Sequence, residues 1–147
     1  MTSTGKARAM GLNHIALEVG DIDAALAFYA RFLDFELRSR SDNMAFIDLG
    51  DQFIALARTD GRATDAHRHY GLVVDDQTAA LAALDREAIA RQGNRVLDPW
   101  GNRLELVGYP EIQFTKAAHV LHGMGLDGLE KTEAALDQLA AKNMAPG

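Results

Sequence analysis

Hydrophobic and polar residues alternate along the segment from Leu12 to Val19. Ile15, Leu17 and Val19 fall on one side of an extended chain and the residues between them on the other, which is the two-residue period of a half-buried strand. Asp21 then precedes a segment with the three-and-four spacing of one buried helix face. Its apolar residues are Ile22, Ala25, Leu26, Tyr29, Phe32 and Leu33. The pattern predicts a strand followed by a capped amphipathic helix.

Three more strands are predicted after this helix, at residues 35–40, 44–49 and 53–57. The last two flank Gly50-Asp51, where glycine supplies the positive φ of a tight hairpin turn. Residues 59–66 are polar and contain a glycine, so we expect them to form a linker. The first part of the chain is therefore predicted to form a βαβββ module.

The start of this module recurs 55 positions later, where His69 corresponds to His14 and Asp76 to Asp21. An Ala-Ala-Leu triplet follows each aspartate at the same spacing. Such self-similarity indicates two copies of one supersecondary unit. The second copy has a helix at about residues 78–85, and only residues 86–97 remain for its two middle strands. These strands are expected to be short and to turn at Gly93-Asn94.

The elements together predict an α+β fold in which paired βαβββ modules form a curved mixed sheet around a metal cavity. We expect a flexible N-terminus at residues 1–10, a single domain at 11–108 and a C-terminal helical extension at 109–147. Module one would span residues 11–58 and module two residues 67–108. The extension is predicted to contain a helix at 132–143, because its alanines and leucines share one face.

The strand phase also predicts a cluster of ligand side chains. If the apolar residues of four strands pack on helices, then His14, His69, Ala55 and Glu105 all point to the opposite face. A carboxylate in an apolar strand needs a hydrogen bond, an ion pair or a metal. Two imidazoles and one carboxylate hold Fe(II), and suit Mn(II) or Zn(II), with open positions for a substrate. The pattern therefore predicts a metal site at His14, His69 and Glu105.

Other interpretations of these residues stay open. Each histidine alone could be a hydrogen-bonded core residue, and Glu105 could form a surface ion pair with Arg95 or Arg103. His119 and His122 lie three apart on a predicted helix and could share a metal, but no carboxylate accompanies them at motif spacing. We expect these two to be surface histidines.

A substrate pocket is predicted beside the ligands, with core packing as the alternative for its aromatic residues. The expected lining residues are Phe46, Phe53, Ala55, Trp100 and Arg103. A general base cannot be identified from the sequence. Glu18 and Asp48 are candidates, because their strand phase places them on the cavity face.

Composition narrows the classes of protein further. The net charge of −6 and the pI near 5.3 disfavour a nucleic-acid-binding surface. The absence of cysteine excludes disulfides, thiolate zinc sites and a cysteine nucleophile. No apolar run is long enough to span a membrane, and residues 1–10 lack the apolar core of a signal peptide. A cytoplasmic protein that binds a small molecule is the expectation.

These residues resemble the vicinal oxygen chelate superfamily, which includes glyoxalase I, extradiol dioxygenases, fosfomycin-resistance proteins and bleomycin-resistance proteins. The resemblance runs from about Gly11 to Gly108. It rests on Asn13-His14-Ile15-Ala16-Leu17, on Phe28-Tyr29 with Leu33-Asp34-Phe35, on His69, and on Asp98-Pro99-Trp100-Gly101-Asn102 leading to Glu105.

The resemblance implies paired modules around a divalent metal, Fe2+, Mn2+, Zn2+ or Ni2+, that binds substrate oxygens and stabilises negative charge on an enolate or alkoxide. By position, the ligands would be His14, His69 and Glu105. Ala55 replaces the carboxylate that glyoxalase I uses for proton transfer. Members often form homodimers and sometimes exchange modules between chains.

We therefore expect a metal-dependent enzyme that acts on a small oxygen-chelating substrate, with dioxygenase-like chemistry. One alternative is a metal-free binding protein like the bleomycin-resistance proteins. Another is a glyoxalase I-like lyase or isomerase.

Overall fold

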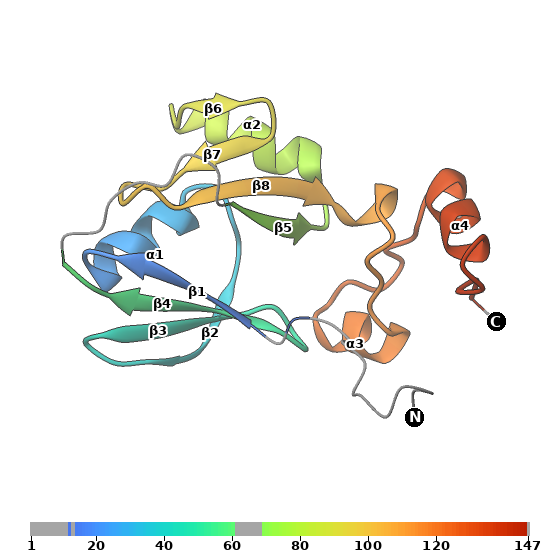
Figure 1. Cartoon of the computed structure of the whole chain (residues 1–147), viewed down its shortest axis with the longest axis horizontal. Coiled ribbons are helices and arrows are strands. Elements are labelled where there is room, and N and C mark those ends of the chain that lie inside the picture. Colours follow the sequence, from blue (N-terminus) through green and yellow to red (C-terminus); the bar gives the residue numbers. More distant parts are fainter. Residues whose placement is uncertain (1–11, 13, 61–68, 147) are drawn as a thin grey trace, which may run out of the picture.

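The computed structural model describes residues 12, 14–60 and 69–146. Module one has its strands and helix in the predicted order (Figure 1). Its elements are β1 (His14–Val19), α1 (Ile22–Ala30), β2 (Glu36–Arg40), β3 (Met44–Asp48) and β4 (Phe53–Arg58). The expectations for residues 1–10, and for the module starts at residues 11 and 67, lie outside the described residues.

Module two repeats this order with shorter middle strands. Its elements are β5 (Tyr70–Val74), α2 (Gln77–Arg86), β6 (Arg91–Gln92), β7 (Arg95–Leu97) and β8 (Arg103–Gly108). β6 and β7 turn at Gly93, whose φ is +61°, so the predicted short hairpin is confirmed. The extension contains the 3-10 helix η1 (Tyr109–Glu111), α3 (Ala118–Gly123) and α4 (Glu133–Ala140), and α4 confirms the helix expected there.

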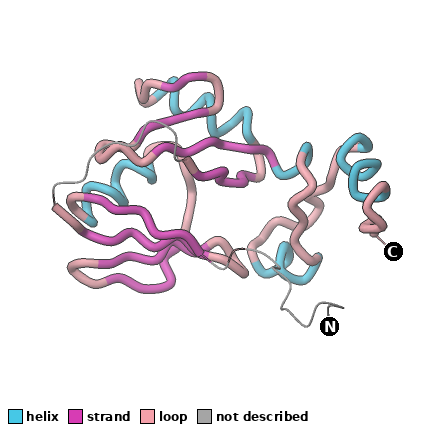
Figure 2. Tube along the Cα trace, in the orientation of Figure 1, coloured by secondary structure: helices cyan, strands magenta, loops and turns pink. Residues whose placement is uncertain are grey.

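The strands form two four-stranded sheets with the same topology (Figure 2). The strand orders are β1-β4-β3-β2 and β5-β8-β7-β6, and the first strand of each module runs parallel to the last. The α+β class and the paired βαβββ modules are therefore confirmed. Among the described residues the two sheets are separate, whereas the sequence analysis expected them to join into one curved sheet.

The two module helices begin with equivalent caps. The Asp21 carboxylate accepts a hydrogen bond from the Ala24 amide at 2.7 Å, and the Asp76 carboxylate accepts one from the Ala79 amide at 3.0 Å. Each cap satisfies an amide that has no partner inside its helix, which typically stabilises a protein by about 1 kcal/mol.

The described helices are short: α2 has 10 residues, and none in the described part of the chain is long and apolar enough to cross a bilayer.

Both modules share one hydrophobic core. In Figure 1, α1 lies between the sheet of module one below it and the sheet of module two above it. The rings of Phe28 and Tyr29 on α1 and of Phe32 just after it pack against one another with centroids 5.2–6.1 Å apart. The buried strand residues of this core include Leu17, Val19, Ile47, Ile54, Leu56, Leu72, Leu104 and Leu106. Burying one such leucine side chain contributes about 1.5–3 kcal/mol of stability. The apolar residues of the predicted strand phase are therefore the ones that face the core.

Candidate functional site

Each sheet has one face on the core and one open face, and the candidate ligands lie on the open faces. In β1, His14 and Glu18 are exposed whereas Leu17 is only 1% exposed. In β8, Glu105 is partly exposed whereas Leu106 is fully buried. The alternation follows directly from the two-residue period of a strand.

His69 and Glu105 lie close together in module two. His69 immediately precedes β5, which pairs with β8 so that Gly71 is opposite Glu105 in the register. His69 Nε2 lies 3.6 Å from Glu105 Oε2. Arg95 on β7 faces Glu105 from the other side, with its Nε 3.5 Å from the same oxygen. Glu105 therefore has an imidazole and a guanidinium beside it.

His14 belongs to a different cluster, on the open face of module one. Its ring stacks on that of Phe53, with centroids 4.6 Å apart and an interplanar angle of 9°. The Arg38 guanidinium also lies over the Phe53 ring, 4.8 Å from its centroid, and the Phe46 ring is 5.2 Å from that of Phe53. The orientation of the His14 ring thus depends on Phe53.

One chain does not bring the three predicted ligands together. His14 is in the sheet of module one, and His69 and Glu105 are in or beside the sheet of module two. Within residues 12, 14–60 and 69–146 there is no group of three or more His, Cys, Asp or Glu side chains that could hold a metal ion. The pair in module two still fits a metal, because two ligand atoms bound to one ion lie about 3–4 Å apart.

The other predicted site residues divide between the two modules. Phe46, Phe53 and Ala55 are on β3 and β4, and Ala55 is 4% exposed and pairs with Phe46 in the register. Arg103 is on β8, two residues from Glu105 and therefore on the same face. Trp100 lies elsewhere, with its indole so close to Gly20 that a Cβ there would collide with it.

The two candidate bases differ in their surroundings. Asp48 accepts a hydrogen bond from Arg38 Nε at 2.7 Å, so its carboxylate is engaged in an ion pair. Glu18 is exposed on the strand that carries His14, and its backbone oxygen accepts a hydrogen bond from Asn102 at 2.7 Å. The structure thus places Asp48 in an ion pair with Arg38 and Glu18 on the strand that carries His14.

A buried network around Asp98 was not predicted from the sequence, where Asp98-Pro99 entered only as part of the segment leading to Glu105. Asp98 is 5% exposed, and its Oδ1 accepts hydrogen bonds from the amides of Trp100 and Asn102 at 2.9 and 2.8 Å. Its Oδ2 accepts hydrogen bonds from the Tyr29 hydroxyl at 2.9 Å and from Asn102 Nδ2 at 2.7 Å. The turn that precedes Glu105 is thus bound to α1 and β1, and it joins the modules.

The Tyr29 hydroxyl responds strongly to this environment. Burial, together with the neighbouring Asp98 carboxylate, raises the pKa of Tyr29 far above its ordinary value. The hydroxyl therefore stays protonated and donates a hydrogen bond to Asp98. The signal that could have found this network is an aspartate immediately after a strand and four residues before an asparagine. Its partner Tyr29 is 69 residues away and is set by packing.

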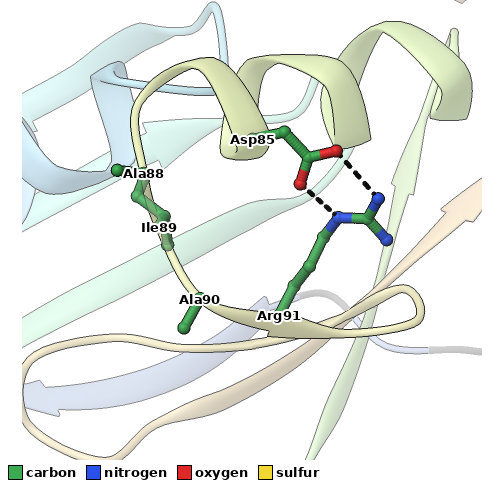
Figure 3. A pocket seen from close by; sticks show the side chains of 5 residues that line it. All are labelled: Asp85, Ala88, Ile89, Ala90 and Arg91. Atoms are coloured by element: carbon green, nitrogen blue, oxygen red, sulfur yellow. Dashed lines mark hydrogen bonds and ion pairs between the residues drawn. The ribbon is translucent and has the colours of Figure 1, made fainter.

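An open pocket of about 510 Å³ lies at the C-terminal end of α2 (Figure 3). It is lined by Asp85, Ala88, Ile89, Ala90 and Arg91. Arg91 donates two hydrogen bonds to Asp85 at 2.8 and 2.9 Å and a third to the Gly93 oxygen at 2.6 Å. The bonds from Arg91 to Asp85 lower the pKa of Asp85, and each guanidinium nitrogen makes one hydrogen bond. None of the residues lining this pocket is a predicted site residue.

The rival histidines are on α3, as expected for surface residues. His122 Nδ1 lies 2.9 Å from Asp127 Oδ1, and both side chains are more than two-thirds exposed. His119 is also exposed.

The chain was compared with known proteins. A family model described as the Glyoxalase/Bleomycin resistance protein/Dioxygenase superfamily matches residues 11–106. The chain belongs to this superfamily. The match includes both modules, with His14, His69 and Glu105, and ends before the extension. No curated protein matches the chain.

Solved structures resemble this chain over about two thirds of its length. A Bacillus anthracis protein assigned to the glyoxalase family has a TM-score of 0.58 and 18% identity, over 69% of this chain and 96% of its own. The fosfomycin resistance protein FosX from Listeria monocytogenes has a TM-score of 0.58 and 16% identity, over 67% of this chain and 91% of its own. At these identities the likeness shows the fold alone.

Proposed function

We propose that this superfamily member is a divalent-metal-dependent enzyme that acts on a small oxygen-chelating substrate. The metal, Fe2+, Mn2+, Zn2+ or Ni2+, would be held by His69 and Glu105 of one chain and by His14 of a second chain. The observation that carries the proposal is the 3.6 Å separation of His69 Nε2 and Glu105 Oε2 on an open sheet face. An imidazole nitrogen and a carboxylate oxygen at this spacing suit two neighbouring ligand positions of one ion.

A second chain supplies His14 most simply through the sheet edges. β1 and β5 are both edge strands in their sheets; His14 is the first residue of β1, and His69 immediately precedes β5. An edge strand presents backbone groups that can pair with another chain. A homodimer joined at β1 and β5 would bring His14 of each chain toward His69 and Glu105 of the other. Because a twofold interface is self-complementary, it would create two equal sites.

The bound metal would act as a Lewis acid that stabilises negative charge developing on a substrate oxygen. Around it, Phe46 and Phe53 would cover the apolar part of the substrate and exclude water. Arg103 lies on the same face as Glu105 and would orient an anionic oxygen. Glu18 is the candidate base, because it is exposed on the strand that carries His14.

Dioxygenase-like chemistry remains our preferred reaction class over a glyoxalase I-like isomerisation. The resemblance assigns the proton-transfer carboxylate of glyoxalase I to the position of Ala55, whose methyl group cannot move a proton. Ala55 is also 4% exposed, so little room exists there for a substituting ligand.

The proposal is tested by mixing two full-length variants, each of which lacks one metal ligand. His14→Ala and Glu105→Gln homodimers should each lose the metal, because every site in them lacks a ligand. After the two variants are unfolded and refolded together, half of the dimers should be mixed, and each mixed dimer has one intact site. The metal content by elemental analysis should then recover to about one quarter of the wild-type value, as twofold symmetry requires. A matched control is His119→Ala, whose exposed side chain is outside the proposed site and should leave the metal content unchanged.

Two results would contradict this proposal in different ways. A metal-binding wild type with no recovery in the mixture would place all three ligands in one chain. A wild type that binds none of the four metals would remove the metal centre altogether.

A metal-free binding protein is the second candidate, and the Arg95 contact favours it. The guanidinium already neutralises Glu105, with Nε 3.5 Å from Oε2, so the open face can hold this carboxylate without a metal. In that case ligand affinity should be indifferent to chelators, and Arg95→Met should weaken it more than Glu105→Gln.

A further inference from the structure

Residues 109–146 follow module two and lie beyond the superfamily match, which ends at residue 106. The compared structures are matched over more than nine-tenths of their own length, yet they cover at most 69% of this chain. The family match therefore does not include the extension. Figure 1 shows it leaving the end of β8 and passing beside the strands of module one at α3.

The first turn of the extension is organised by Lys131. Its Nζ donates hydrogen bonds to the backbone oxygens of Tyr109 at 2.7 Å and Ile112 at 2.8 Å, and also to that of Phe114. The same ammonium lies 3.6 Å from the centroid of the Tyr109 ring. A cation with three carbonyl acceptors and an aromatic face is well satisfied. Residues 109–114 therefore have a defined path, and this path determines where residue 116 lies.

Lys116 connects the extension to the turn between β3 and β4. Its side chain is 9% exposed and forms an ion pair with the Asp51 carboxylate. Its backbone amide donates to the Tyr109 hydroxyl at 3.3 Å, and its Nζ lies 5.6 Å from the centroid of the Phe114 ring. The buried stem and the paired charge make Lys116 a fixed contact with the turn.

Met124, at the C-terminal end of α3, makes a second contact with the same turn. Gly50 has a φ of +94°, and a Cβ placed on it would lie 2.6 Å from Met124 Sδ. The thioether therefore packs directly on the glycine backbone. We call residues 109–126 the clasp, because Lys116 and Met124 hold the turn at two adjacent residues, Gly50 and Asp51.

The turn held by the clasp is continuous with the His14 cluster. Arg38 Nη2 donates to the backbone oxygens of Gly50 at 2.7 Å and of Gln52 at 3.0 Å, and its guanidinium covers the Phe53 ring. Phe53 follows the turn directly and stacks on His14 with nearly parallel rings. The contacts therefore run without interruption from the clasp to His14.

We infer that Lys116 is a positioning residue, which fixes the orientation of the His14 ring through the β3–β4 turn and Phe53. The inference rests on the proposed function only for the role of His14 as a metal ligand. A ligand held in one orientation before the metal arrives loses less conformational freedom on binding. The clasp thus supplies to this chain a support for His14 that lies outside the family match.

The test compares Lys116→Met with wild type in metal-free protein. Methionine keeps the apolar stem and removes the charge. Amide hydrogen exchange at residues 49–53 should accelerate up to about fivefold, as expected when about 1 kcal/mol of local protection is lost. The ring signals of His14 in NMR spectra should shift and broaden. In the metal-binding assay the affinity should fall about tenfold, the lower end of the usual effect of losing a residue that orients a ligand.

Controls separate positioning from general damage to the fold. Lys142→Met removes another lysine of the extension, whose Nζ bonds to Gln113 Oε1 at 2.5 Å and not to the turn, and it should leave all three readouts unchanged. Lys116→Arg keeps the charge and should restore most of the wild-type behaviour. If Lys116→Met does not fold, Asp51→Asn removes the same ion pair at an exposed residue and should give the same changes.

Unchanged hydrogen exchange at residues 49–53 and unchanged His14 signals in a folded Lys116→Met or Asp51→Asn protein would overturn the inference. These two readouts need no metal, so they decide the inference even if wild-type protein binds none. A change in them in a protein that binds no metal would support the clasp and contradict the proposed metal centre. The two proposals therefore fail independently.

Discussion

The Asp98 carboxylate is the residue through which the two modules are most directly joined. It accepts four hydrogen bonds, and two of its donors, the Trp100 and Asn102 amides, belong to its own turn. A third donor, Tyr29, comes from α1 of the other module. A charge as buried as this one is tolerated because each oxygen has two donors. The same network sets the position of the turn from which β8 and Glu105 emerge.

Replacing Tyr29 by phenylalanine should therefore destabilise the whole domain. The substitution keeps the ring that packs on Phe28 and removes only the hydroxyl that binds Asp98. Loss of a hydrogen bond to a buried charged group costs about 1.5–3 kcal/mol in free energy of unfolding. Urea denaturation followed by circular dichroism measures this change. Tyr70→Phe, at a half-buried tyrosine of module two, is the matched control and should cost less than half as much.

At the scale of elements, the extension and the β3–β4 hairpin are coupled by a titratable contact. The hydrogen bond from Lys116 is the main cause that lowers the pKa of Asp51 below its ordinary value of 3.8. A carboxylate whose pKa is lower in the folded than in the unfolded state adds stability above the unfolded pKa and loses it as the pH falls through the folded pKa. The contact should therefore weaken only in acid below about pH 4.

Acid titration should release the clasp before the domain unfolds. Between pH 6 and pH 3, the NMR signal of the Met124 methyl group should move toward the position of a solvated methionine, while far-UV circular dichroism stays constant. The loss is modest, because Asp51 is half exposed and surface ion pairs contribute at most about 1 kcal/mol. Asp51→Asn should show the shifted signal already at pH 6 and no further change. A Met124 signal that does not respond to pH in wild type would contradict this coupling.

At the scale of the whole molecule, the arrangement of the sheets separates His14 from His69 and Glu105. The two sheets share a core through α1, and their open faces each carry part of the ligand set. Under the proposed function, a second copy of the chain would complete the three-ligand centre. Metal binding and dimer formation should then be linked, because a ligand that binds only the dimer stabilises the dimer.

Sedimentation velocity should reveal this linkage. At free metal of about 100 times its dissociation constant, each of the two sites contributes a factor of about one hundred. The monomer–dimer dissociation constant should therefore fall roughly ten-thousandfold relative to protein in a chelator. The dimer dissociation constant of His14→Ala should not depend on the metal, since each of its sites lacks one ligand. Equal metal affinity for monomer and dimer would contradict the linkage and favour a site within one chain.

Much of the fold follows from the sequence because its signals are local. The strand phase of His14, Leu17 and Glu105, the caps at Asp21 and Asp76, and the short second hairpin at Gly93 all depend on residues a few positions apart. Periodicity determines which side chains share a face, and hydrogen bonding to nearby amides determines where a helix begins. The repeat of the two modules could be recognised because each copy carries the same local pattern of strand, cap and helix.

The placement of these faces relative to one another was decided only by the tertiary structure. Strand phase put His14 on an open face but carried no information about which sheet would oppose it, and the two sheets remain separate. Tyr29 with Asp98, and Lys116 with Asp51, are 69 and 65 residues apart, and each pair meets through packing of whole elements. Periodic patterns specify directions within an element, whereas distances between elements depend on the combined packing of side chains from the entire chain.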